Sequence, residues 1–179
     1  MAGIDEALSA LVAKREIEEV VLRYCRGIDR MDRELVRSCY HADATDEHGS
    51  FRGGVEEFLD WVWRLLGRYE TTMHFVGNVL VELAGDAAVA ESYGVAWHTS
   101  ADPRPQWNLV TGFRYLDRFE RRDDAGWRIA RRIVVTEWSR VDGPKDRWLP
   151  PPGFRRGRRD RADALYELLE GLRAPPRER

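Results

Sequence analysis

The stretch Tyr-Leu-Asp-Arg-Phe-Glu-Arg-Arg-Asp-Asp-Ala-Gly-Trp-Arg-Ile-Ala, residues 115–130, decides how the second half of the chain is interpreted. It crosses the junction of two long segments, 107–122 and 127–141, which are rich in the β-branched and aromatic residues that favour strands. The residues between them, 123–126, are Asp-Asp-Ala-Gly, a composition that favours a tight hairpin turn. The stretch therefore predicts a pair of long antiparallel strands.

Two further segments of the same kind lie just before this pair. Residues 72–82 and 87–98 have the composition of strands, and Ala-Gly-Asp at 84–86 between them suits a second hairpin. The connection to the next strand contains Asp-Pro-Arg-Pro at 102–105, which is a turn signal. Together the segments predict a four-stranded meander.

The first half of the chain has the spacing of helices. Apolar residues recur every three or four positions over 8–24, which predicts an amphipathic helix. A second short helix is expected over 32–40 and a third from 55 to about 68. The segment 41–54 breaks this pattern, apart from a short strand expected near 44–47. Three helices followed by strands predict an α+β fold, with the helices packed on one face of a curved antiparallel sheet.

The length and composition indicate one domain with a tail. A chain of 179 residues with 43% hydrophobic residues buries one good core, which we assign to residues 1–143. Residues 144–179 are rich in Pro and Arg and form a C-terminal tail, in which 162–172 is expected to be a short helix. The basic run 155–159 is expected to be solvated or to close over a pocket or a neighbouring subunit.

The charge and the cysteines exclude several classes of function. A formal net charge of -2 gives no overall attraction to nucleic acid or to a membrane surface. The two cysteines, Cys25 and Cys39, have no ligand spacing, so neither a disulfide framework nor a metal site is expected. Neither a signal peptide nor a run of about 18 apolar residues occurs, and a cytoplasmic protein is expected.

Several motifs, spread in order over residues 7–140, resemble one family. The chain is similar to the SnoaL-like branch of the NTF2-like superfamily, whose domain is a cystatin-like cone. The resemblance rests on Arg23-Tyr24-Cys25-Arg26-Gly27-Ile28-Asp29, Tyr40-His41-Ala42-Asp43-Ala44 with His48-Gly49, His74-Phe75-Val76-Gly77-Asn78, Glu91-Ser92-Tyr93, and residues 115–122 with 126–130.

Within that superfamily the chain most resembles the group of scytalone dehydratase, hexachlorocyclohexane dehydrochlorinase and bile-acid 7α-dehydratase. The resemblance implies a catalytic dyad of Asp29 and His74 that works without metal or organic cofactor. It further implies that Tyr24 and Arg132 act as catalytic partners. His98 is the counterpart of a second pocket histidine and is expected to bind substrate.

Each of these residues also has a plainer interpretation. Asp29 suits a helix cap and His74 a hydrogen-bonded core position. Tyr24 suits core packing, Arg132 a surface salt bridge and His98 the end of a strand.

Aromatic residues are frequent enough to line an apolar pocket as well as the core. Trp107 and Trp138 are the two aromatic residues expected to contact substrate, and His48 is a further candidate. Such a pocket suits a small hydrophobic cyclic ligand, for example a steroid or a polyketide.

The expected reaction is proton removal from carbon followed by elimination, as in a dehydratase, with isomerisation or cyclisation by the same fold as alternatives. Two alternatives remain for the function: a domain whose pocket only binds a small ligand, and an accessory subunit comparable with the β-subunits of ring-hydroxylating dioxygenases. The resemblance also implies a homo-oligomer, with a trimer favoured over a dimer.

Overall fold

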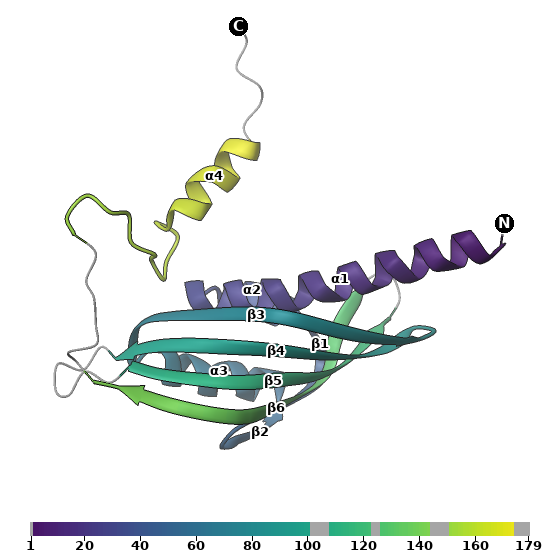
Figure 1. Cartoon of the computed structure of the whole chain (residues 1–179), viewed down its shortest axis with the longest axis horizontal. Helices are drawn as coiled ribbons and strands as arrows, with labels where there is room; N and C mark the ends of the chain where they lie inside the picture. Colours follow the sequence, from purple (N-terminus) through teal and green to yellow (C-terminus); the bar gives the residue numbers. More distant parts are fainter. Residues whose placement is uncertain (1, 101–107, 123–125, 144–150, 174–179) are drawn as a thin grey trace, which may run out of the picture.

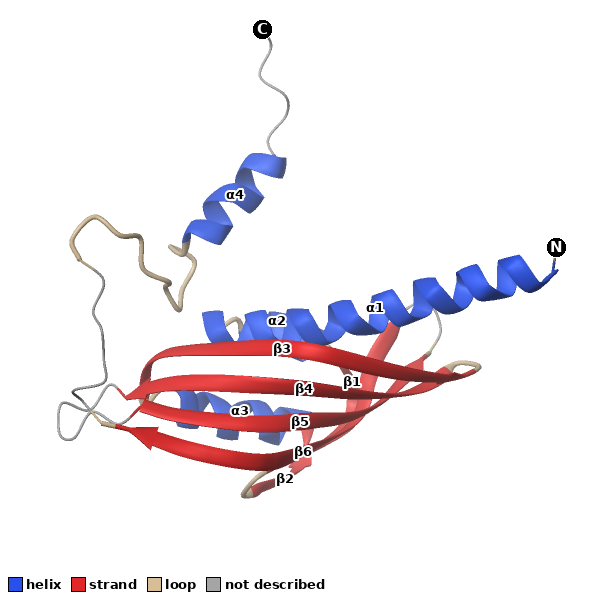
Figure 2. Cartoon of the chain, in the orientation of Figure 1, coloured by secondary structure: helices blue, strands red, loops and turns tan. Residues whose placement is uncertain are grey.

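A computed structural model describes residues 2–100, 108–122, 126–143 and 151–173 (Figure 1). In chain order the elements are α1 (Ala2–Arg30), α2 (Arg33–Ser38), β1 (Tyr40–His48), β2 (Phe51–Gly54), α3 (Val55–Leu66), β3 (Tyr69–Ala84), β4 (Ala87–Ser100), β5 (Asn108–Arg121), β6 (Trp127–Asp142) and α4 (Ala164–Arg173). The predicted α+β class is confirmed, and Figure 2 shows α1, α2 and α3 beside a curved, open sheet, with α4 apart from it.

The predicted meander forms the greater part of one six-stranded sheet. The strand order is β2-β1-β6-β5-β4-β3, and β3 to β6 pair antiparallel with their neighbours in sequence. Gly85 adopts a φ of 60° in the turn that joins β3 to β4, a conformation that glycine adopts readily. The predicted turn residues 123–125 lie outside the described part of the chain.

The sheet differs from the prediction at its other edge. Residues 41–54 form two strands instead of one short one, and β1 lies parallel to β6, so the sheet is mixed. The expected strand covers only the middle of β1, because β1 buries polar side chains. Asp46 is 1% exposed, and one of its carboxylate oxygens accepts a hydrogen bond of 2.7 Å from the Tyr40 hydroxyl. A buried acid of this kind breaks the apolar alternation by which strands are recognised.

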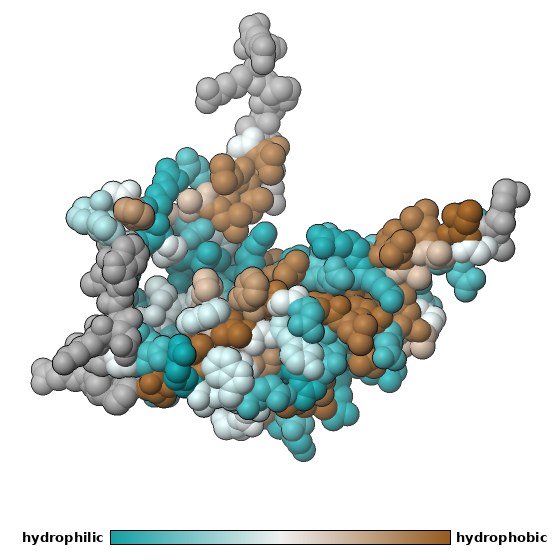
Figure 3. All heavy atoms as spheres, viewed as in Figure 1, coloured by the Kyte–Doolittle hydropathy of each residue, from teal (hydrophilic) through white to brown (hydrophobic). Residues whose placement is uncertain are grey.

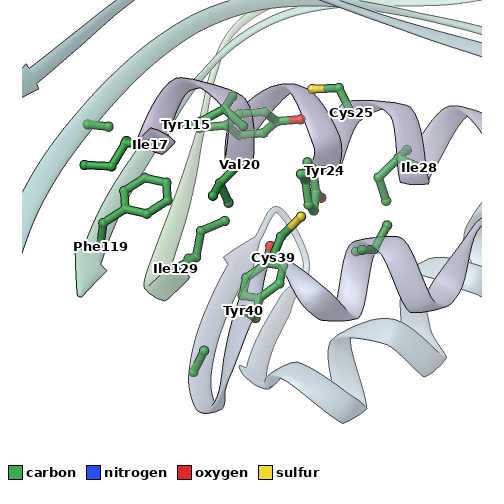
Figure 4. Packing of buried hydrophobic residues seen from close by; sticks show 14 of the residues in the cluster. Ile17, Val20, Tyr24, Cys25, Ile28, Cys39, Tyr40, Tyr115, Phe119 and Ile129 are labelled. Carbon is green, nitrogen blue, oxygen red and sulfur yellow. The ribbon is translucent and has the colours of Figure 1, made fainter. Parts of the chain in front are cut away.

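The core lies between the sheet and the helices, as Figure 4 shows. The apolar stripe of α1 includes Ile17, Val20 and Ile28, all buried, and it packs toward Phe119 of β5 and Ile129 of β6. Burial of this stripe supplies most of the stability of such a helix, since an isolated helix is marginal in water. The last turns of α1 are thereby held against the sheet.

A short helix follows directly and fixes the end of α1. Asp32 caps α2, since its carboxylate accepts a hydrogen bond from the Leu35 amide at 3.1 Å. Met31, between the two helices, has a φ of 53°, which reverses the chain direction. The turn places the C-terminal end of α1 beside the beginning of β3, and Figure 1 shows α1 running along that strand.

The C-terminal segment contains the expected short helix, which is α4. Residues 158–166 contact the end of α1: Asp163 pairs with Arg30 at 3.5 Å, and the Tyr166 hydroxyl donates to Asp32 at 3.4 Å. Figure 3 shows apolar side chains on the outer part of α4 and on the N-terminal turns of α1. No helix in the described residues is long and apolar enough to cross a membrane.

Candidate active site

Asp29 and His74 meet where α1 ends against β3. One carboxylate oxygen of Asp29 lies 2.7 Å from Nδ1 of His74, and the other accepts a hydrogen bond of 2.8 Å from the His74 backbone amide. The strand order explains why this amide is available: β3 is the outer strand of the sheet, so every second amide faces away from β4. The same contacts that join helix to sheet therefore fix both side chains.

This geometry decides which nitrogen of His74 carries the proton. Burial raises the pKa of Asp29, but the hydrogen bonds and the charge of His74 outweigh it and hold the pKa below its ordinary value. An ionised carboxylate only accepts hydrogen bonds, so Nδ1 must be the donor in neutral His74. Nε2 then keeps its lone pair. The side chains of His74 and Asp29 are only 9% and 12% exposed, so water competes little with their hydrogen bond.

A second histidine faces His74 from the neighbouring strand. The ring centroids of His74 and His98 lie 5.5 Å apart, and the ring centroid of Tyr69 lies 4.8 Å from that of His98. Burial, followed by the charge of His74, lowers the pKa of His98 to about 4, so His98 is neutral at pH 7. Within the described residues its buried Nδ1 has no hydrogen-bond partner. The structure thus brings His98 to the Asp29–His74 pair, as predicted.

Phe113 of β5 supplies an apolar wall that the sequence prediction missed. Its ring centroid lies 6.1 Å from that of His74 and 4.5 Å from that of Tyr115. The alternation of apolar and polar residues in the sequence indicates that Phe113 faces the inside of the sheet. It does not indicate which of the inward-facing side chains lies next to His74. Among the described residues, Phe113 and His98 are thus the rings that lie next to the His74 ring, and Tyr69 follows behind His98 through its own ring contact.

Tyr24 and Arg132 lie in the core instead. The Arg132 guanidinium is fully buried and makes two hydrogen bonds to Asp117, of 2.7 and 2.6 Å. The rings of Tyr24 and Tyr115 each lie 4.0 Å from the guanidinium carbon. Tyr24 is 1% exposed and also packs on Tyr40 at 6.0 Å. The structure therefore places both residues in the core, around the pair of Arg132 with Asp117, and their catalytic roles stay a prediction.

His48 has a different environment from His74. It stacks on Phe58 of α3 at 5.4 Å, and its Nδ1 lies 3.4 Å from Asp46. Neither contact involves Asp29, His74 or His98. The structure therefore does not bring His48 together with the dyad, because β1 and β3 lie on opposite sides of the meander.

Trp138 lies on the opposite face of the sheet from His74, and the expectation that it lines the same pocket is wrong. It pairs with Gly112, and its ring covers the position that a Gly112 Cβ would occupy. Alternation from Arg132 would place Trp138 inward, but a bulge at Glu137 shifts the register by one residue. Trp138 is 48% exposed there. Trp107, the other tryptophan predicted to bind substrate, lies outside the described residues.

A metal centre finds no support in the described ranges, where no three His, Cys, Asp or Glu side chains gather as metal ligands would. What the site offers is an oriented imidazole with one free nitrogen, a neutral second imidazole and aromatic walls. Such an arrangement can accept a proton from a bound molecule.

Comparison with known proteins identifies the class to which this fold and site belong. Residues 9–133 match the model of the SnoaL-like domain, and the chain belongs to that family. The search of curated proteins gives no match.

Solved structures confirm the NTF2-like, cystatin-like fold. A protein titled "Putative Scytalone Dehydratase" from Novosphingobium aromaticivorans is 19% identical with a TM-score of 0.68, covering 84% of this chain and 99% of its own. A type 2 hexachlorocyclohexane dehydrochlorinase (LinA) is 19% identical with a TM-score of 0.70, covering 83% and 99%. An NTF2-like protein with a cystatin-like fold from N. aromaticivorans is 23% identical with a TM-score of 0.60, covering 76% and 90%. At these identities the likeness concerns the fold.

Proposed function

We propose that the protein is a lyase that removes a proton from carbon without a cofactor, most simply a dehydratase acting on a small cyclic hydrophobic substrate. The observation that carries this proposal is the bond between Asp29 and Nδ1 of His74, which leaves Nε2 as the base. The SnoaL-like domain and the dehydrochlorinase and dehydratase titles among similar structures agree with this class of reaction.

The first step is proton transfer to His74. Nε2 takes a proton from a carbon next to a carbonyl group, and the ring becomes a cation. Asp29 stabilises this cation through the bond of 2.7 Å while holding the ring in one orientation. The electron pair of the broken C–H bond forms an enolate.

The second step is loss of the leaving group. The enolate electrons form a double bond to the adjacent carbon, and a hydroxyl group departs from that carbon. The proton held by His74 is transferred to this oxygen, so the products are water and an unsaturated ring. His98 is neutral at pH 7 and therefore adds no second positive charge beside the His74 cation during these steps.

The substrate class follows from the walls of the site. Phe113 and Tyr69 present ring surfaces next to the two histidines, and such surfaces favour a flat or ring-shaped molecule. An apolar environment also strengthens the attraction between Asp29 and the cationic ring, which favours the proton transfer.

The test compares wild type with His74→Gln. Each protein is incubated with a library of cyclic hydroxy-ketones and with small-molecule extract, and consumed compounds are identified by mass spectrometry. We expect wild type alone to form a product lighter by one water.

The matched control is His41→Gln. His41 is also a buried histidine, but its ring forms a hydrogen bond of 2.9 Å with the Glu120 carbonyl. Glu120 lies at the C-terminal end of β5, whereas His98 pairs with Leu109 at the N-terminal end of that strand. This variant should convert the same compound at the wild-type rate. Compounds that bind to wild type and to His74→Gln equally, without conversion, would refute the lyase and favour a ligand-binding domain.

A further inference from the structure

The helix α1 carries a second apolar stripe, on the face that points away from the core. Five apolar side chains on this face are between 47% and 75% exposed: Ile4, Leu8, Leu11, Val12 and Leu22. About two and a half turns separate Leu8 from the buried Ile17, so these two side chains point in opposite directions. Single apolar residues on a surface are ordinary, but an ordered stripe of them marks an interaction site.

Another exposed apolar surface lies at the other end of α1, on α4. Leu168 and Leu172 are 69% and 82% exposed and lie about one turn apart. Arg30 pairs with Asp163 just before α4, and Figure 1 shows α4 rising from this end of α1 on the side away from the strands. Leu8 and Arg30 are 22 residues apart, which is about 33 Å along a helix. In its place at Arg30, α4 therefore does not cover the first turns of its own α1.

The outward face of α1 is complementary to itself when the helix is reversed. Arg15 and Glu19 lie on the same face as the stripe, and their side chains are 63% and 54% exposed. Val12 and Leu22 flank these charges, each five residues from position 17, and the two charged residues are each two residues from it. When two copies of α1 lie antiparallel and cross at position 17, apolar side chains therefore meet apolar ones and positive charge meets negative charge.

The same alignment brings α4 into the contact. Position 4 of one copy then lies opposite position 30 of the other, so the partner's Ile4 arrives beside Arg30 and the beginning of α4. Leu168 and Leu172 offer apolar surface there for the partner's first turns. Because the arrangement is two-fold symmetric, the same contact forms at both ends, and each copy covers the stripe that the other leaves exposed.

We propose that α1 and α4 form a two-fold interface between two copies of this chain, with the two α1 helices antiparallel. Removing both apolar stripes from water drives the association, and the four charges at the centre fix the register. The contact is a property of the free protein and needs no substrate.

Site-specific crosslinking tests the register. Val12→Cys and Leu22→Cys are purified separately and then oxidised with diamide, each alone and as an equal mixture. In the proposed pair, position 12 of one copy faces position 22 of the other, whereas the two copies of either position lie about 15 Å apart. A disulfide requires Cα atoms within about 7 Å, so we expect a linked dimer in the mixture and none in either variant alone. The chain's own Cys25 and Cys39 are buried and do not compete.

Sedimentation equilibrium tests whether the stripe drives association. Leu8→Glu places a charge in the apolar stripe and should raise the dimer dissociation constant at least tenfold. Leu80→Glu is the matched control, since Leu80 is 60% exposed on β3, and it should keep the wild-type constant. A monomeric wild type, or a weaker dimer in Leu80→Glu than in Leu8→Glu, would overturn the proposal. Equal linkage in the mixture and in the single cysteine variants, or linkage in none of them, would overturn it as well.

Discussion

Replacement of Asp29 by Asn changes the charge of the dyad while keeping its shape. Asn retains an oxygen that can accept the bond from the His74 amide, now 2.8 Å long, so the junction of α1 with β3 should survive. Loss of charge-assisted hydrogen bonds costs about 1–2 kcal/mol, which is small against a typical stability of about 5–15 kcal/mol. The variant should therefore fold, and its defect should lie in the reaction.

The size of the defect follows from the distance of 2.7 Å between Nδ1 of His74 and the Asp29 carboxylate. Two unit charges about 4 Å apart attract by about 4 kcal/mol at an effective dielectric constant of about 20. This attraction exists only after His74 has taken the proton. In the variant the one Asn oxygen accepts from the His74 amide and the NH2 group faces Nδ1, so this attraction is lost. A loss of about 3–4 kcal/mol is expected, equivalent to about 10²–10³-fold in rate.

The assay is the initial rate of water loss from a substrate found by the mass-spectrometric comparison. Rates over a range of substrate concentrations separate kcat from KM. We expect kcat to fall by about 10²–10³-fold with a nearly unchanged KM, because Asp29 acts on the charge that develops in the transition state. Asp43→Asn is the control, since Asp43 forms an exposed pair with Arg122, and it should have wild-type kinetics. A folded Asp29→Asn variant with a kcat within threefold of wild type would refute the reasoning.

Three other predictions concern stability, each measured by urea unfolding. Burial lowers the pKa of His98 from about 6.5 in the unfolded chain to about 4 in the folded protein. As pH falls from 6.5 to 4, wild type should therefore lose up to about 3 kcal/mol of stability relative to His98→Gln, and above pH 7 the difference between the two proteins should stay constant. An equal pH dependence would contradict the burial of His98. Arg132→Met should lower the free energy of unfolding by about 3–5 kcal/mol, because Asp117 is left as an unpaired buried charge. The double variant with Asp117→Leu should regain much of that stability. A loss below about 1 kcal/mol in Arg132→Met would contradict the buried pair. Gly27→Ala should lower the free energy of unfolding by about 1–3 kcal/mol, because the new Cβ would lie 2.5 Å from a Val36 methyl group. Gly3→Ala is the control, since a Cβ at Gly3 meets no atom within 4 Å, and it should cause no loss. Equal effects of the two substitutions would contradict the packing of α1 on α2.

The meander could be predicted because its strands alternate clearly and end at turn residues such as Gly85. The strand β1 could be predicted only in its middle, near 44–47, since its full length depends on buried polar contacts such as the hydrogen bond from Tyr40 to Asp46, which form only in the tertiary structure. Sequence patterns assign apolar residues to the core and polar residues to the surface or to loops, so a polar pair that is buried, such as Tyr40 with Asp46, is not recognised. The helix–sheet class was therefore correct, while the edge of the sheet was incomplete.

The candidate site was predictable only in part. Asp29 and His74 are 45 residues apart, and their pairing came from the resemblance to SnoaL-like proteins rather than from spacing. Trp138 was misplaced because a single bulge reverses the alternation of β6. The ion pair of Arg132 could not be predicted, because its partner, Asp117, lies on another strand and only the assembled sheet brings the two together.

Proton removal by His74 can be measured directly with a substrate that carries deuterium on the carbon next to its carbonyl. Wild type should release this deuterium to water as the unsaturated product forms, with a rate lower than that for the undeuterated substrate. His74→Gln should release none above the background without enzyme, and Asp29→Asn should release it about 10²–10³-fold more slowly. Release by His74→Gln at the wild-type rate would contradict the account.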